Sequence, residues 1–258
     1  QLIAAAILIL ISSKYLVTSS AKIATKIGLG HTFVGIVLLA TATSLPELAT
    51  GVSSITLANA PDLAAGAAFG SNIVNLLIIA IADVIWPRGP MLASVSRGPI
   101  IVAILGIAII LIASLSTAIH HWTEIFDHWY ISPLSIVLIL FFLVATYIVY
   151  RIDNTNNDSG KAKKAEKDAN NKFDYETKRA FTFYIISALC IIGTSIWLAE
   201  VGDRLAETLQ WEESFVGTQF LAISTSLPEL ATTIAALRLG NPEMAVANLL
   251  GSNLFNMG

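Results

Sequence analysis

Two glutamates lie near the middle of long apolar stretches. Glu47 and Glu229 occur in the same eight-residue sequence, Thr-Ser-Leu-Pro-Glu-Leu-Ala-Thr, at 43–50 and again at 225–232. A carboxylate inside the hydrocarbon core of a bilayer is costly, and such residues usually face the interior of a helix bundle and mark a path for ions or protons. No Lys or Arg lies in the middle of any apolar stretch, so a buried base does not explain them.

Small and hydroxyl-bearing residues accompany each glutamate at steps of three or four, which places them along one face of a helix. The two stripes consist of Ala40, Thr43, Glu47, Thr50 and Ser54, and of Ala222, Thr225, Glu229 and Thr232. Each stripe is polar on an otherwise apolar rod. We therefore expect the two stripes to face each other across a shared site.

A proline precedes each glutamate. Pro46 and Pro228 cannot donate a backbone hydrogen bond, so we expect a disturbed helix around the carbonyls of Ala42 and Ser224. The neighbouring hydroxyls belong to Thr43, Ser44, Thr225 and Ser226. Together with the carboxylates these oxygens compose an all-oxygen cage, the kind of site that hard cations prefer.

A second element, Gly-Ser-Asn-x-x-Asn, follows each glutamate at 70–75 and 251–256. It places the pairs Ser71 and Asn75, and Ser252 and Asn256, on one helix face at i, i+4. Their oxygens can coordinate Na⁺ or Ca²⁺ without adding charge, whereas Asn72 and Asn253 suit interhelical hydrogen bonds equally well. Two glutamates and no buried base give a formal charge of −2, which balances one divalent cation or several monovalent ones. If a divalent cation and monovalent cations compete for the same cage, binding of one displaces the other, and the protein can exchange them.

The chain is organised as two copies of a helical pair. Residues 33–50 match residues 215–232 at thirteen of eighteen positions, an offset of 215 − 33 = 182. With 55% hydrophobic and 13% charged residues, the chain has the composition of a polytopic membrane protein. Apolar spans are predicted at 33–58, 62–86, 98–119, 130–150, 181–199 and 214–239, with partial spans at 2–17 and from 242 onward.

The loops alternate in charge along the chain. Lysines near 14–26, arginines at 88 and 97, and the polar stretch 151–180 are basic, whereas 120–129 and 200–213 are acidic. The positive-inside rule then predicts an external N-terminus and a cytoplasmic linker at 151–180. Five spans separate the start from that linker, so the second repeat, 215–256, is inverted relative to the first, 33–75. Inverted repeats are typical of secondary transporters with a site at the midplane.

We expect three parts: a first transmembrane half at 1–150, the linker at 151–180, and an incomplete second half at 181–258. Because Gln1 opens directly on an apolar run and Gly258 falls inside a predicted span, we also expect further residues at both ends. The fold class is therefore all-α, with about eight transmembrane helices visible.

The duplicated Thr-Ser-Leu-Pro-Glu-Leu and Gly-Ser-Asn-x-x-Asn elements resemble the Ca²⁺/cation antiporters, specifically the sodium/calcium exchanger branch. That resemblance implies ten transmembrane helices in two inverted halves, alternating access, and Ca²⁺ export driven by Na⁺. It also implies the ion ligands, with Ala40 and Ala222 contributing backbone carbonyls. The implied ligands are Ala40, Thr43, Ser44, Glu47, Ser71, Asn75, Ala222, Thr225, Ser226, Glu229, Ser252 and Asn256.

Two departures and one alternative bear on the coupling ion. Relatives of the potassium-dependent branch carry Asp where Asn256 stands, so Asn256 disfavours K⁺ coupling. The cation/proton branch has Gly-Asn before its glutamate, unlike the Thr-Ser-Leu-Pro of this chain. Exchange of Ca²⁺ or another divalent cation for H⁺ remains the alternative, because a midplane glutamate can carry a proton. An enzyme, a cofactor and a nucleic-acid partner are not expected; the expected partners are Na⁺, Ca²⁺ and the lipid bilayer.

Overall fold

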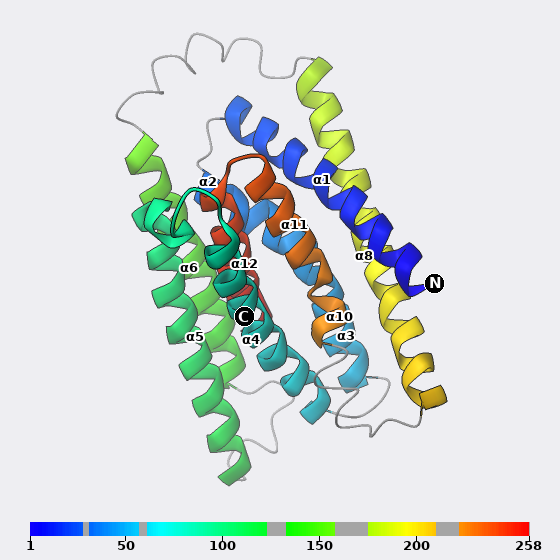
Figure 1. Cartoon of the computed structure of the whole chain (residues 1–258). Helices are drawn as coiled ribbons and strands as arrows, with labels where there is room; N and C mark the ends of the chain where they lie inside the picture. Colours follow the sequence, from blue (N-terminus) through cyan, green and yellow to red (C-terminus); the bar gives the residue numbers. More distant parts are fainter. Residues whose placement is uncertain (28–30, 57–60, 123–132, 158–174, 210–221, 258) are drawn as a thin grey trace.

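The computed structural model describes residues 1–27, 31–56, 61–122, 133–157, 175–209 and 222–257, and these are helical or turn-like with no strand among them (Figure 1). The helices are α1 Leu2–Ile27, α2 His31–Val34, the π-helix η1 Gly35–Ala40, α3 Thr41–Thr56, α4 Pro61–Ile85, the 3₁₀ turn η2 Met91–Ser94, α5 Arg97–Trp122, α6 Pro133–Asn157, α8 Tyr175–Leu209, α10 Ala222–Thr225, α11 Leu227–Arg238 and α12 Pro242–Met257. Six of the described segments are long and apolar enough to cross a membrane.

The two repeats run in opposite directions through the bundle. Figure 1 shows α2, η1 and α3 descending from the end at which α8 begins, while α10 and α11 rise toward that end. α1 and α8 pack against each other on one side of the repeats, and α5 and α6 on the other. The predicted all-α fold with inverted repeats is confirmed.

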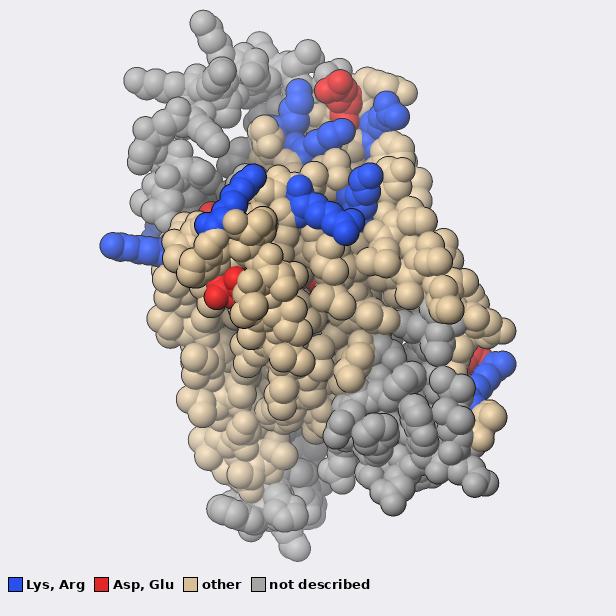
Figure 2. All heavy atoms as spheres, in the orientation of Figure 1, with Lys and Arg blue, Asp and Glu red and all other residues tan. Residues whose placement is uncertain are grey.

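The outer surface is apolar, as expected of a protein whose solvent is lipid. On α5 and α6 the exposed side chains include Ile104, Ile107, Leu111, Leu140 and Leu143. Such a surface would be an aggregation hazard in water, whereas in a bilayer it costs nothing to expose. Lys and Arg gather instead over the end of the molecule at which α8 begins (Figure 2).

The first helix is longer than the sequence analysis predicted. The expected span 2–17 followed by a basic connection is wrong, because α1 continues to Ile27 and includes its lysines. The last turns are amphipathic: Ser20 and Ala24 are buried, whereas Lys22 and Lys26 are exposed. Packing of that buried face stabilises the extra turns, which helix propensity alone would not.

Several predicted segments fall partly outside the described residues. α6 continues to Asn157 and α8 begins at Tyr175, so both ends of the predicted linker 151–180 are helical, and 158–174 lie outside the description. Outside the description also lie 123–129 of the acidic loop predicted at 120–129, 130–132 at the start of the predicted span 130–150, and 210–221, which include the start of the second repeat.

A close crossing joins the first repeat to the second. A Cβ added at Gly251 of α12 would lie 2.8 Å from the Cα of Ile36, and one added at Gly35 would lie 2.7 Å from the Cβ of Ala247. Both distances are shorter than carbon atoms tolerate, so only glycine allows η1 and α12 to approach in this way. Gly251 therefore serves the close packing of these two helices.

A carboxylate also ties α12 to its neighbours at the basic end of the bundle. The hydroxyls of Thr32 in α2 and Ser96 before α5 each donate to Oε1 of Glu243, at 2.6 Å. Charge-assisted hydrogen bonds of this length are about twice as strong as neutral ones. Glu243 therefore fixes the start of α12, whose later turns carry Ser252 and Asn256.

Candidate ion-binding site

Five helices, α3, α4, α10, α11 and α12, carry the predicted oxygen-bearing side chains. The hydroxyls of Ser44 and Ser252 each donate to Oε1 of Glu229, at 3.3 Å. The hydroxyls of Thr43 and Ser252 lie 3.5 Å apart. Residues of the two repeats that lie up to 209 positions apart thus meet near the Glu229 carboxylate, although Ser44 and Ser252 belong to neither of the two predicted stripes.

The threonine of each repeat makes the same local contact. Thr43 Oγ1 donates to the carbonyl of Ala40 and Thr225 Oγ1 to that of Ala222, both at 3.3 Å. A carbonyl oxygen has two lone pairs, so each alanine oxygen can accept this bond and still face a cation. The two repeats therefore have the same hydrogen bond at equivalent positions. Ala40 and Ala222 are the two residues whose backbone carbonyls were expected to be ion ligands.

The asparagines divide into two kinds. The amide of Asn75 donates to Oδ1 of Asn253 at 2.9 Å, and the amide of Asn256 donates to Oδ1 of Asn72 at 3.4 Å. The amide of Asn253 in turn donates to the backbone carbonyl of Asn72 at 3.5 Å. These bonds join α4 to α12, so Asn72 and Asn253 take the interhelical hydrogen-bonding role, one of the two roles that the sequence left open for them. Oδ1 of Asn75 and Oδ1 of Asn256 accept no hydrogen bond from the described residues.

Seven buried oxygens of the predicted ligand residues have no hydrogen-bond partner among the residues that the structure describes. They are Glu47 Oε1 and Oε2, Glu229 Oε2, Ser71 Oγ, Ser226 Oγ, Asn75 Oδ1 and Asn256 Oδ1. A buried polar atom without a partner costs about 1–3 kcal/mol, and more when charged. A cluster of seven acceptors drawn from both repeats fits a cation as cargo.

Neither glutamate is neutralised by a base. Glu229 is fully buried; Glu47 is partly buried as a residue, but both its carboxylate oxygens are buried. Among the side chains that the structure describes, neither carboxylate pairs with a Lys or Arg, and no third His, Cys, Asp or Glu joins the two carboxylates. The described side chains gathered here therefore carry two carboxylates and several neutral oxygens.

The two prolines do not act alike. The helix breaks between α10 and α11 at Ser226, with φ −84° and ψ 3°, so that Pro228 lies in the first turn of α11. In the first repeat, α3 continues through Pro46, and the disturbance predicted there lies one turn earlier as the π-helix η1. A π-helical turn widens the helix and often occurs at functional sites.

One neighbour of the site was not predicted. The amide of Asn248 donates to Oγ1 of Thr232 at 3.0 Å, and that hydroxyl donates to the carbonyl of Pro228 at 2.8 Å. Asn248 precedes Ser252 by one turn on α12, so helical spacing could have found it. Its counterpart position in the first repeat is Ala67, so Asn248 does not belong to the duplicated pattern.

The sequence model of the sodium/calcium exchanger protein family matches residues 1–153 and 179–258 of this chain. The chain belongs to the sodium/calcium exchanger family. It is 27% identical to the inner membrane protein YrbG of Escherichia coli over 99% of this chain and 75% of that protein. It is 26% identical to the sodium/calcium exchanger MaX1 of Methanosarcina acetivorans over 95% of this chain and 76% of the relative.

The fold is shared with a solved exchanger. Structures of the sodium-calcium exchanger NCX_Mj superpose with a TM-score of 0.74 at 21% identity, over 98% of this chain and 76% of theirs. This family member is thus an integral, multi-pass helical membrane protein and a cation antiporter of the exchanger type. The predictions of a transporter, and not an enzyme, and of its family are confirmed.

Proposed function

We propose that this exchanger moves Ca²⁺ in one direction and Na⁺ in the other through the site between Glu47 and Glu229, by alternating access. The observation that supports this most directly is the cluster of seven unpartnered oxygens contributed by both repeats. Carboxylate, hydroxyl, amide and carbonyl oxygens are the ligands that Ca²⁺ takes, in sets of six to eight. The relative MaX1 is named as a sodium/calcium exchanger.

The ligand set that we propose is the one predicted from the sequence. Its side chains are Thr43, Ser44, Glu47, Ser71, Asn75, Thr225, Ser226, Glu229, Ser252 and Asn256, and its backbone carbonyls are those of Ala40 and Ala222. Two carboxylates balance one Ca²⁺ or two Na⁺, so both cargoes can neutralise the same site. Because they compete for the same oxygens, one ion must leave before the other binds.

Exchange of Ca²⁺ for H⁺ is the second candidate. It is favoured by the burial of two carboxylates with no base beside them, since a buried carboxylate can be neutralised by a proton as well as by a cation. A carboxylate pair that carried protons would need no Na⁺ gradient. The neutral ligands favour transport of a metal ion in both directions. Hydroxyl and amide oxygens can coordinate a metal ion, but they do not take up a proton near neutral pH.

The deciding experiment is uptake of radiolabelled Ca²⁺ into proteoliposomes that contain the whole protein, at clamped pH, with and without an outward Na⁺ gradient. We expect uptake only with the Na⁺ gradient. Uptake that ignores Na⁺ and follows an imposed pH gradient would overturn Na⁺ coupling and select H⁺. Uptake with no gradient of either ion would argue against exchange altogether.

We further propose that the basic end of the bundle faces the cytoplasm. Lys22 and Lys26 end α1, Arg97 begins α5 and Arg238 ends α11 at that end, and cytoplasmic loops carry such an excess. Single cysteines at Lys22 and at Glu200, introduced into a protein lacking Cys190, test this in oriented membrane vesicles. An impermeant thiol reagent that reached Lys22→Cys only from the external face would refute the orientation.

A further inference from the structure

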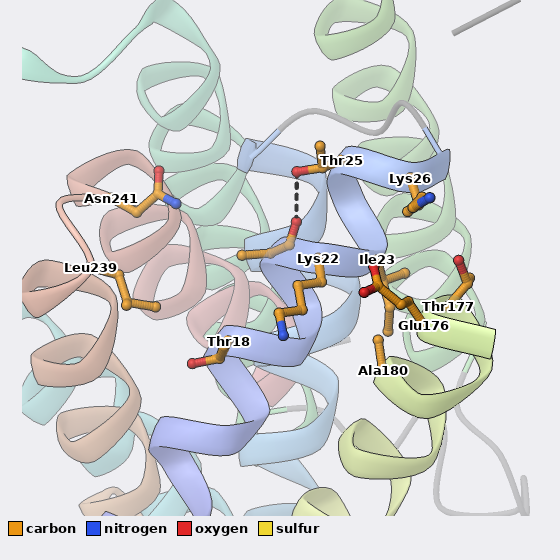
Figure 3. A pocket seen from close by; sticks show the side chains of 11 residues that line it. Thr18, Lys22, Ile23, Thr25, Lys26, Glu176, Thr177, Ala180, Leu239 and Asn241 are labelled. Atoms are coloured by element: carbon orange, nitrogen blue, oxygen red, sulfur yellow. Dashed lines mark hydrogen bonds between the residues drawn. The ribbon is translucent and has the colours of Figure 1, made fainter. Parts of the chain in front are cut away.

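A pocket of about 450 Å³ lies between the end of α1, the start of α8 and the turn between α11 and α12. Figure 3 shows Lys22 of α1 with Thr177 and Ala180 of α8 on one side and Leu239 and Asn241 on the other. Neither glutamate of the ion site lines it. It is a second site with a different chemistry.

The charge of this pocket is positive. Lys22 and Lys26 are one turn apart on α1, both are exposed, and neither forms an ion pair within the described part of the chain. Glu176 is the acidic residue among the lining side chains, so two positive charges face one negative charge. An anion of charge −1 or −2 suits this lining, and a cation does not.

A buried hydroxyl adds a directed donor. Thr177 is 4% exposed, lines the pocket, and its Oγ1 has no hydrogen-bond partner among the described residues. The amide of Asn241 lies at the opposite wall. A phosphate at the α8 side of the pocket can accept from the Thr177 hydroxyl and from an ammonium group, and charge-assisted hydrogen bonds are the strong ones.

The surface that continues from the pocket is apolar and aromatic. The rings of Tyr15 and Phe183 stack at a centroid distance of 6.0 Å where α1 meets α8, and both are exposed. Beyond them along α8, Ile186 and Leu189 are exposed as well. A ligand with a phosphate in the pocket and a hydrocarbon chain along this seam would satisfy both surfaces, and a basic helix end is at the depth of lipid headgroups.

We propose that this pocket binds the phosphate headgroup of an anionic phospholipid, whose acyl chain lies along the Tyr15–Phe183 seam. The bound headgroup joins the α1 and α8 pair to the turn at Leu239 and Asn241, next to α12. It therefore links the peripheral helices to an element of the ion site. Binding stands by itself; an effect of the lipid on exchange rests on the proposed function.

The test is native mass spectrometry of the purified whole protein titrated with phosphatidic acid, or with phosphatidylcholine of the same acyl chains. Each basic residue near a membrane surface contributes about 5-fold to anionic lipid binding, so Lys22→Gln with Lys26→Gln should weaken phosphatidic acid binding about 30-fold. The matched control is Lys14→Gln with Lys178→Gln, which removes the same charge from exposed positions of α1 and α8 outside the pocket. Thr177→Val tests the site without changing charge.

The expected result is loss of preference for phosphatidic acid in the pocket pair and in Thr177→Val, with the control pair unchanged. Equal weakening by both lysine pairs would overturn the pocket and leave only general attraction to a basic surface. Calorimetry with inorganic phosphate separates the two sources of the anion: free phosphate binding as tightly as the lipid would overturn the lipid assignment. Ca²⁺ uptake is measured separately, so a failed exchange assay does not bear on binding.

Discussion

Removing one carboxylate charge from the ion site should cost Ca²⁺ binding more than Na⁺ binding. Glu229→Gln keeps an oxygen where Ser44 and Ser252 donate and removes one unit of charge. At an effective dielectric constant of about 20, two unit charges about 4 Å apart attract by about 4 kcal/mol, and a divalent ion beside one carboxylate by about 8 kcal/mol. The structure thus makes the two cargoes unequal in their dependence on this residue.

The net effect is smaller, because desolvation of ion and carboxylate opposes the attraction. If desolvation cancels two thirds of it, about 2.7 kcal/mol remains for Ca²⁺ and about 1.3 kcal/mol for Na⁺, or about 100-fold and about 10-fold losses of affinity. Selectivity for Ca²⁺ over Na⁺ should therefore fall about 10-fold. Glu47→Gln removes the same unit of charge and should also weaken Ca²⁺ binding more than Na⁺ binding, although both oxygens of Glu47 lack a donor among the described residues whereas Oε1 of Glu229 has two.

The assay is Ca²⁺ uptake over a range of Ca²⁺ concentrations, with Na⁺ added on the same side as competitor. Glu200→Gln is the matched control, because it loses only an exposed ion pair with Arg204, worth about 0–1 kcal/mol. Wild-type concentration dependence in both Glu47→Gln and Glu229→Gln would refute the assignment of the site. Equal losses for the two ions would refute the charge argument and leave only a geometric one.

Three further outcomes are expected. Gly251→Ala, which forces a Cβ to within 2.8 Å of a backbone atom, should lower stability by about 1–3 kcal/mol in thermal unfolding, whereas Gly193→Ala, with open space around its Cβ, should not. Asn256→Asp should raise Ca²⁺ affinity and enlarge the Ca²⁺-induced rise in Tm; an unchanged rise would place this residue outside the site. Glu243→Gln and Thr32→Val should couple by about 0.5–3 kcal/mol in a double-mutant cycle, and strict additivity would contradict the hydrogen bond between them.

The sequence predicted which polar residues gather between the two repeats better than it predicted the helices around them. Glu47, Glu229 and their hydroxyl and amide neighbours were found because each appears twice, at an offset of 229 − 47 = 182 in the first element and of 256 − 75 = 181 in the second. Duplication turns a weak pattern into a specific one, and its inverted topology followed from loop charge and a count of spans. The observed antiparallel course of α3 and α11 agrees with that count.

What the sequence did not predict depends on tertiary packing. The length of α1 depends on the burial of Ser20 and Ala24, and this burial cannot be predicted from their residue types. A disturbed helix was expected next to Pro46, but the irregular segment is the π-helix η1. It begins at Gly35, where the chain crosses α12 closely, and this contact is not visible in the sequence. Asn248 has no polar counterpart in the first repeat, so the duplication of the sequence does not reveal it.

The seven unpartnered oxygens bear on why an antiporter of this design would not leak. When the site is closed to water from both faces of the membrane and holds no cation, these oxygens face one another with their lone pairs and negative charge uncompensated. Each unpartnered oxygen then costs about 1–3 kcal/mol or more. The barrier to switching sides is then lowest when cargo neutralises the cluster. Under the proposed function, the unsatisfied oxygens themselves would forbid an unloaded return, and strict counter-transport would follow from electrostatics without a separate gate to enforce it.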